Sequence, residues 1–141
     1  MKKPFVTKEQ VEEIVKKYPT PFYLYDEKQI RENVRAVLKA FSWNKGYKEY
    51  FAVKATPTPK ILQILREEGC GTDCSSYTEL LMSDACGFKD GEIMFSSNET
   101  PAQDYQLAKK LNATINLDDI THIAFLEKVA GIPETISCRF N

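Results

Sequence analysis

The sequence lacks the features that define several common classes of protein. No stretch reaches the roughly 18 apolar residues that a membrane-spanning helix needs, and the first residues turn charged before a signal-peptide core could form. The 19 basic and 20 acidic residues leave a net charge of -1, with no stretch in which basic residues concentrate. Such a surface does not suit a nucleic acid. We therefore expect a cytoplasmic protein that binds neither membranes nor nucleic acids.

Histidine and cysteine are scarce, and several ligand-binding motifs are absent. The one histidine, His122, has no second histidine at ligand spacing, so we predict no metal site. The four cysteines form no Cys-x-x-Cys pair and are too few for a secreted disulfide scaffold, so we expect reduced thiols that mostly pack in the core. No dinucleotide-binding, Walker or Gly-x-Ser-x-Gly motif is present, which removes the main sequence support for those enzyme classes.

The helix starts are marked by residues that satisfy free backbone N–H groups. Asp26 can cap one helix, and Pro59 and Pro101 suit a first helical position, where a missing N–H costs nothing. Three pairs fit the capping box, in which each side chain accepts a hydrogen bond from the other residue's backbone. These pairs are Thr7 with Gln10, Ser76 with Glu79, and Thr100 with Gln103.

Five short apolar runs alternate with the helical segments and predict a parallel sheet. We expect these strands to be apolar on both faces, because each return to the same edge of a parallel sheet needs a helical crossover that covers the sheet. The first fifty residues differ: they predict a helix from residue 7, an extended segment at 21–25 that pairs outside the main sheet, and a second helix after Asp26. The predicted strands are residues 50–53, 72–74, 93–95, 114–117 and 135–140. The fold class is α/β.

Polar residues follow these strands, at the edge where parallel α/β folds bind ligands. They include Lys54, Asp73, Ser75, Ser76, residues 96–98, Asn116, Asp118 and Arg139. An ammonium group that closes a buried strand is costly unless it is paired or covalently neutralised, as in a lysine bonded to an aldehyde. The alternative for Lys54 is a lysine whose stem crosses apolar surface while its ammonium reaches water.

Three further charged residues have both a functional and a structural interpretation. Asp73 either orients a cation such as Arg139 or accepts backbone hydrogen bonds at a turn. Glu79 is explained by the capping box of Ser76, so a catalytic role needs independent support. Arg139 suits a carboxylate or a phosphate, and equally a surface ion pair.

Three motifs together carry a resemblance to a known family. They are Thr-Pro-Phe-Tyr-Leu-Tyr-Asp at 20–26, Phe-Ala-Val-Lys-Ala at 51–55, and Gly-Thr-Asp-Cys-Ser-Ser-Tyr-Thr-Glu at 71–79. The sequence resembles the fold-type III, alanine-racemase-like decarboxylases that use pyridoxal phosphate, and its first motif is most similar to that of the diaminopimelate decarboxylases. The resemblance implies that Lys54 is the catalytic lysine that bears the cofactor, and that Asp73, Glu79 and Arg139 line the cofactor pocket.

The implied reaction converts meso-diaminopimelate to lysine. The substrate amine would displace Lys54 from the cofactor, carbon dioxide would leave, and the carbon would then be reprotonated. Ornithine, arginine and carboxynorspermidine decarboxylases, and amino-acid racemases of the same fold, are alternatives. A non-catalytic, decarboxylase-like regulator or a binding module is an alternative of another class.

The family fold is a (β/α)8 barrel with a separate β domain, and the complete enzymes are homodimers. By this resemblance, residues 1–25 form a helix and strand that join the C-terminal β domain, and residues 26–141 form the first part of the barrel. A full barrel takes roughly 250 residues, so about five βα units fit here and we expect the chain to be truncated. The remaining catalytic groups would lie after residue 141, so we expect the fragment itself to be inactive.

Overall fold

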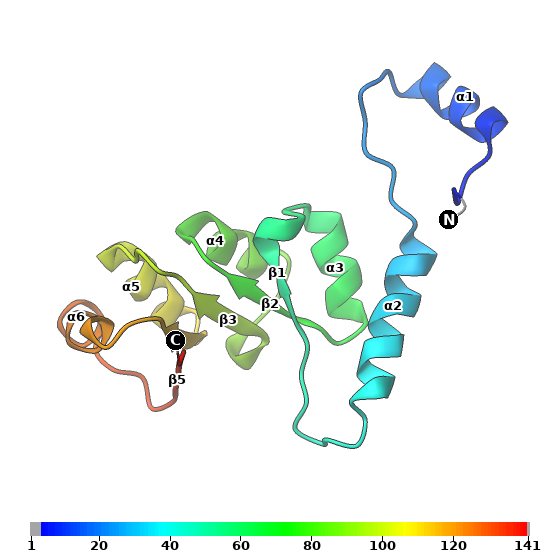
Figure 1. Ribbon diagram of the computed structural model, residues 1–141. Coiled ribbons are helices and arrows are strands. Elements are labelled where there is room, and N and C mark those ends of the chain that lie inside the picture. The colour runs from blue at the N-terminus through cyan, green and yellow to red at the C-terminus, as the bar shows by residue number, and fades with distance from the viewer. Residues whose placement is uncertain (1–3, 141) are drawn as a thin grey trace.

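Five parallel strands, each followed or preceded by a helix on the same side, form the body of the chain (Figure 1). The computed structural model describes residues 4–140; residues 1–3 and 141, at the ends of the two predicted segments, lie outside the described residues. The strands are β1 Tyr50–Ala52, β2 Gly71–Cys74, β3 Ile93–Ser96, β4 Thr114–Leu117 and β5 Ile136–Cys138. The helices are α1 Lys8–Lys17, α2 Glu27–Ala40, α3 Pro59–Glu67, α4 Tyr77–Ala85, α5 Ala102–Lys110 and α6 Thr121–Val129.

The strand order in the sheet is the order in the sequence, β1-β2-β3-β4-β5. All four neighbouring pairs are parallel, and the helices α3, α4, α5 and α6 make the crossovers between them. This is the start of a βα-barrel, so the predicted α/β class and the partial barrel of about five units are confirmed. β1 and β5 are the two edges of the sheet within residues 4–140.

The strands are buried on one face only, which corrects the expectation that both faces are apolar. In β3, Ile93 and Phe95 are buried while Met94 and Ser96 are half-buried. The same alternation holds in β4 and from Thr72 to Cys74 in β2, whose first residue, Gly71, is also buried. Successive strand residues point to opposite faces, and the helices cover just one of them. We call the other the open face. It carries Ala52, Asp73, Met94, Ser96, Thr114, Asn116 and Ser137.

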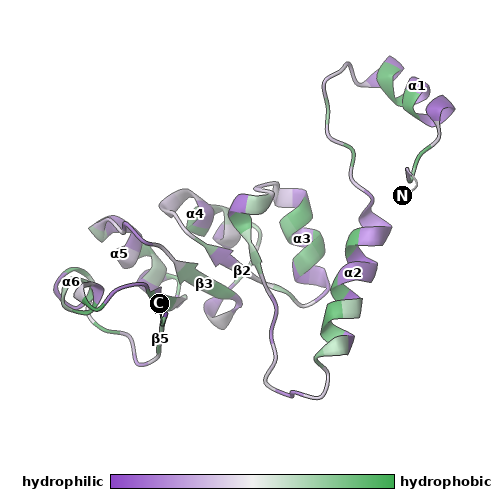
Figure 2. Cartoon of the chain, in the orientation of Figure 1, coloured by the Kyte–Doolittle hydropathy of each residue, from purple (hydrophilic) through white to green (hydrophobic). Residues whose placement is uncertain are grey.

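The core lies between the sheet and its helices. α3 contributes four buried residues to it, which give the helix its green stretches in Figure 2. Cys70, Cys74 and Cys86 are buried free thiols, as predicted, and burial raises the pKa of Cys70 and Cys74 to about 11. These two thiols stay protonated at neutral pH and act as small apolar side chains. Cys138, on the edge strand β5, is exposed.

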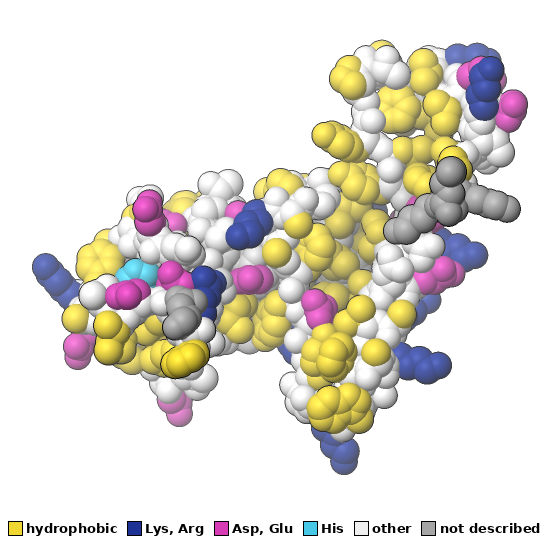
Figure 3. All heavy atoms as spheres, viewed as in Figure 1, with side chains coloured by type: hydrophobic (Ala, Val, Ile, Leu, Met, Phe, Trp, Pro, Cys, Tyr) yellow, Lys and Arg dark blue, Asp and Glu magenta, His cyan; other side chains and the backbone are white. Residues whose placement is uncertain are grey.

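The N-terminal segment stands apart from the sheet (Figure 1). Thr7 and Gln10 form the predicted capping box at the start of α1. Residues 21–25 have no strand partner within residues 4–140, and their pairing with a later β domain stays a prediction. Large hydrophobic side chains gather on this segment in Figure 3; the exposed ones include Val11, Val15, Tyr18, Tyr23, Leu24 and Tyr25. No helix within residues 4–140 has the length and apolar content to cross a bilayer.

Most of the predicted helix starts are correct, but one capping box is absent. Asp26 caps α2, and Pro59 opens α3 as predicted. The box expected for Thr100 and Gln103 does not form. The helix α5 begins one residue later with Pro101 as its cap, because the hydroxyl of Thr100 donates back to the carbonyl of Ser97 and continues the loop.

A charged cluster joins α2 to the end of α3. The guanidinium of Arg31 pairs with Glu27, Glu67 and Glu68, and Arg35 binds both oxygens of Glu68 through two hydrogen bonds of 2.6 Å. The Glu68 side chain is only 9% exposed, so this bidentate pair is better ordered than an ordinary surface ion pair. Hydrogen bonds from Arg35 and Arg31 lower the pKa of Glu68 to about 2.

Replacing Glu68 by glutamine should lower stability at neutral pH but not in strong acid. The folded pKa lies below the ordinary value of 4.5, so the charged carboxylate stabilises the fold above that pH. This contribution is lost as the pH falls toward about 2. Urea unfolding of wild type and Glu68→Gln across this range should show two curves that converge in acid. Glu32→Gln is the control, since its pair with Lys28 is exposed; equal pH dependence in both variants would contradict the prediction.

Candidate active site at the carboxyl ends of the strands

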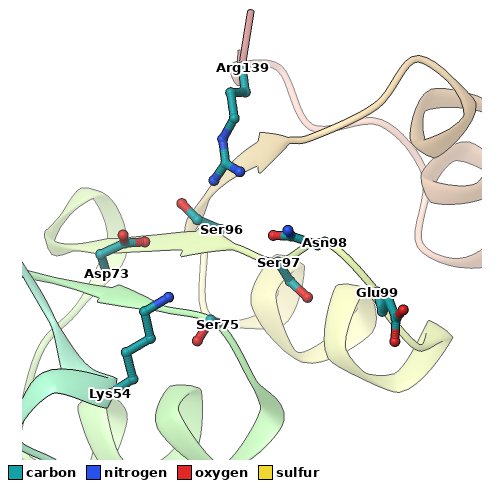
Figure 4. A pocket seen from close by; sticks show the side chains of 8 residues that line it. All are labelled: Lys54, Asp73, Ser75, Ser96, Ser97, Asn98, Glu99 and Arg139. Carbon is teal, nitrogen blue, oxygen red and sulfur yellow. The ribbon is translucent and has the colours of Figure 1, made fainter. Parts of the chain in front are cut away.

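A cavity of about 650 Å³ opens at the carboxyl ends of the strands (Figure 4). Its volume lies within the range of small-molecule sites in proteins. Three of the four residues singled out from the sequence, Lys54, Asp73 and Arg139, line it together. The other lining residues are Ser75, Ser96, Ser97, Asn98 and Glu99. Glu79, the fourth, is not among the lining residues.

Lys54 enters the cavity from a single 3-10 turn, Val53–Ala55, that directly follows β1. Val53 is fully buried and anchors this turn, whereas Lys54 is exposed. The turn therefore carries Lys54 out of the core, and residues 4–140 do not bury its ammonium. Figure 4 shows its side chain extending into the cavity between Asp73 and Ser75. Within residues 4–140 it forms no ion pair, so its amino group is available to a ligand.

Asp73 lies on the open face of β2, and its carboxylate is incompletely paired. Its Oδ1 is buried and accepts no hydrogen bond from residues 4–140. Burial raises the pKa of Asp73, while the hydroxyl of Ser96 and the charges of Lys54 and Arg139 act in the opposite direction. A buried acceptor without a donor is costly, and such a group facing a cavity is available to a ligand that brings a donor.

Arg139 follows β5 and is held by Asp118. Its backbone N–H continues the β4–β5 pairing by donating to the carbonyl of Leu117, and its Nη1 donates to the Asp118 carboxylate. The sequence suggested Asp73 as a partner for this arginine, but the ion pair forms with Asp118. Asp118 fixes the direction of the guanidinium, which points toward the cavity in Figure 4.

Carboxylates of this chain cover the N-terminus of α4. Glu79 accepts hydrogen bonds from the backbone N–H and the hydroxyl of Ser75, and its own N–H donates to Ser76, so half of the predicted capping box forms. Asp104, which is buried in α5, accepts from the N–H of Tyr77 at 3.0 Å. Helix N-termini often bind phosphate, but these three N–H groups already have partners.

Removing the Glu79 carboxylate should destabilise the turn between β2 and α4. Glu79→Ala leaves the backbone N–H of Ser75 without its partner at 2.8 Å, and we expect a loss of about 1–3 kcal/mol in the free energy of unfolding. Glu79→Gln keeps an acceptor and should lose less. Urea unfolding measures both, with the exposed Glu127→Ala as control. Equal losses in Glu79→Ala and Glu127→Ala would refute this role.

Sequence reasoning missed two of these site features. Glu99 is on the rim of the cavity, in the loop after β3, and Asp104 reaches α4 from the neighbouring βα unit. Neither follows an apolar run directly, which was the signal used for the other residues. No group of three or more His, Cys, Asp or Glu side chains among the described residues is placed to hold a metal ion.

The fold and the cavity define a class of protein: a βα-barrel segment that presents an unpaired lysine, an acidic group and an arginine at the carboxyl ends of its strands. The chain belongs to the pyridoxal-dependent decarboxylase family, because the pattern of that family's pyridoxal binding domain matches residues 27–141. This confirms the resemblance found in the three motifs, and it confirms pyridoxal phosphate as the cofactor of the domain. The unpaired lysine and the unfilled acceptor on Asp73 fit such a group.

Known proteins resemble the chain over most of its length. The TabA protein of Pseudomonas amygdali pv. tabaci is 40% identical over 129 residues, and the diaminopimelate decarboxylase of Methanothermobacter thermautotrophicus is 32% identical over 130 residues. Both alignments cover 92% of this chain and 30% of the relative. The structure of diaminopimelate decarboxylase from Helicobacter pylori, complexed with L-lysine, superposes with a TM-score of 0.80 at 32% identity, covering 93% of this chain and 34% of that one. The chain thus spans about a third of its relatives' length.

Proposed function

We propose that this chain provides the cofactor-bearing part of an amino-acid decarboxylase that uses pyridoxal phosphate, with meso-diaminopimelate as the first candidate substrate. One observation carries the proposal. In a chain of this family, Lys54 enters a cavity of about 650 Å³ at the carboxyl end of β1, together with Asp73 and Arg139. A lysine amine that forms no ion pair and extends into a cavity can act as the nucleophile that bonds to an aldehyde.

Each of the four predicted residues has a role in this proposal. Lys54 would hold the cofactor through its Nζ, and as a free amine it could carry a proton at the cavity mouth. Asp73 offers its unfilled Oδ1 to a protonated amine. Arg139, oriented by Asp118, faces a carboxylate or phosphate with its fixed positive charge. Glu79 acts through Ser75, whose backbone and hydroxyl it holds at the cavity wall.

Pyridoxal phosphate, when bound, supplies a ring that accepts the electron pair left behind by carbon dioxide. The N-terminus of α4 does not suit the phosphate of this cofactor, because the N–H groups of Ser75, Tyr77 and Glu79 are engaged by Glu79, Asp104 and Ser76. We infer that the phosphate is held elsewhere, by residues beyond this part of the barrel.

We further propose that the complete protein is a cytoplasmic homodimer and that residues 1–25 pack against a second, β-rich domain. Tyr23 and Tyr18 support the packing, because these residues are 89% and 55% exposed in a segment that makes no strand within residues 4–140. Large aromatic side chains on a surface commonly mark a contact region. A dimer is proposed by analogy with the family.

Carbon dioxide release from candidate substrates tests the proposed function. The complete gene product, saturated with pyridoxal phosphate, is incubated separately with carboxyl-labelled meso-diaminopimelate, ornithine, arginine and carboxynorspermidine. Release of carbon dioxide from diaminopimelate supports the proposal. Release from one of the other three compounds would keep the decarboxylase class but change the substrate. Exchange of the α-proton without release would make the protein a racemase. No reaction, together with no cofactor fixed by borohydride, would favour a regulator or binding module.

A further inference from the structure

Three polar side chains form a row across the open face of the sheet. Ser96, Asn116 and Ser137 come from β3, β4 and β5 and are direct register partners: Ser96 is opposite Asn116, and Asn116 is opposite Ser137. All three are half-buried. The corresponding positions inside a βα-barrel are usually filled by bulky branched apolar side chains. Apolar packing therefore does not explain three half-buried polar side chains at these positions.

The hydrogen bonds along this row all run in one direction. The hydroxyl of Ser137 donates to Oδ1 of Asn116 at 2.9 Å, and Nδ2 of Asn116 donates to the hydroxyl oxygen of Ser96 at 3.4 Å. Asn116 thereby uses both ends of its amide. The hydrogen of the Ser96 hydroxyl remains to be donated. Ser96 lies two residues after Met94, the register partner of Asp73, and the side chains of Ser96 and Asp73 line the same cavity. The Ser96 hydroxyl also acts to lower the pKa of the Asp73 carboxylate.

Within residues 4–140, the strand residues directly opposite Asp73 offer it no side-chain donor. Its direct register partners are Ala52 in β1 and Met94 in β3, and neither side chain carries an N–H or O–H group. Ser96 is the diagonal neighbour on the same face, which lies within reach across adjacent strands. A side-chain amide in the middle of the row does not pass protons along, so the row holds the carboxylate in place and does not conduct protons.

We propose that Ser137, Asn116 and Ser96 are positioning residues, which together hold the Asp73 carboxylate toward the cavity that it shares with Lys54. The row spans β3, β4 and β5, so the direction of the Asp73 carboxylate depends on the pairing of these three strands. The inference rests on the proposed role of Asp73 in the cofactor site. It concerns residues of this chain alone and is measurable without the cofactor.

The test is the titration of Asp73 in cofactor-free protein, followed by carboxyl-carbon NMR after selective labelling of aspartate. Ser96→Ala removes a donor to the charged form and should raise the midpoint by about one pH unit. Asn116→Ala should raise it by a smaller amount, since it acts through Ser96. Ser96→Thr keeps the hydroxyl and should restore the wild-type midpoint. Thr114→Val, on the same face but outside the row, is the matched control.

An unchanged midpoint in Ser96→Ala, or an equal shift in Thr114→Val, would overturn the proposal. If Ser96→Ala fails to fold, Ser137→Ala tests the same row from its far end, with a smaller upward shift expected and no shift overturning it. Fixing the cofactor on Lys54 with borohydride separates this inference from the proposed function. If the Asp73 midpoint is unchanged in Ser96→Ala while the cofactor is still fixed on Lys54, only the role of the row is contradicted. If the midpoint shifts but no cofactor is fixed on Lys54, only the proposed cofactor site is contradicted.

Discussion

Lys54→Ala is expected to abolish covalent capture of pyridoxal phosphate. Lys54 is the only lysine among the residues that line the cavity, and its amine has no ion-pair partner within residues 4–140. An aldehyde bound in the cavity therefore has one nitrogen with which to bond. Reduction with borohydride followed by peptide mass spectrometry should find the cofactor on Lys54 in wild type and on no residue in the variant. In the complete protein, we expect decarboxylation to fall by roughly 10³-fold or more.

Two variants separate the chemistry of Lys54 from its charge and from general loss of lysine. Lys54→Arg keeps the positive charge, but a guanidinium stays protonated at neutral pH and does not bond an aldehyde in this way. Capture should be lost in Lys54→Arg as completely as in Lys54→Ala. Lys110→Ala removes an exposed lysine at the end of α5 and should leave capture intact. Full covalent capture of pyridoxal phosphate in either Lys54 variant would show that Lys54 is not the residue that bonds the cofactor.

The positions of the strands followed from sequence because their signal is local. Residues 114–117 were predicted as a strand and are β4. β1, β2 and β3 each differ from prediction by one residue at one end, and β5 starts one residue later and ends two residues earlier than predicted. Short apolar runs bounded by capped helices are enough to fix such elements. The polar side chains after the strands then gather at one edge, because parallel strands share the direction of their carboxyl ends.

Side-chain partners did not follow from sequence, because they depend on how neighbouring units meet. Asp118 comes 21 residues before its partner Arg139, and Asp104 comes 27 residues after the N–H group of Tyr77 that it binds. No local pattern distinguishes Asp118 from Asp73 as the partner of Arg139. The open face was also misjudged: a strand such as Ile93–Ser96 has too few residues for the polar Ser96 to reveal an alternating pattern.

Gly71→Ala is the second change with a large expected effect. Gly71 is buried in β2, and a Cβ added there would lie 2.5 Å from the backbone oxygen of Glu92 and 2.6 Å from the ring of Tyr50. Tyr50 is the register partner of Gly71, and its hydroxyl donates to the carbonyl of Gly91 at 2.6 Å, so the ring is held over the glycine. We expect the substitution to lower the free energy of unfolding by about 3 kcal/mol.

Urea unfolding measures this loss, and Gly91→Ala is the matched control, because a Cβ there meets no atom within 4 Å. Combining Gly71→Ala with Tyr50→Ala should recover only part of the loss, since the contact with the backbone of Glu92 remains. Equal stability of Gly71→Ala and Gly91→Ala would contradict the prediction. Gly71 opens the motif that carries Asp73, so the expected loss of stability in Gly71→Ala would assign the motif's glycine to close packing of β1 against β2. Asp73 is the residue of this motif that lines the cavity together with Ser75.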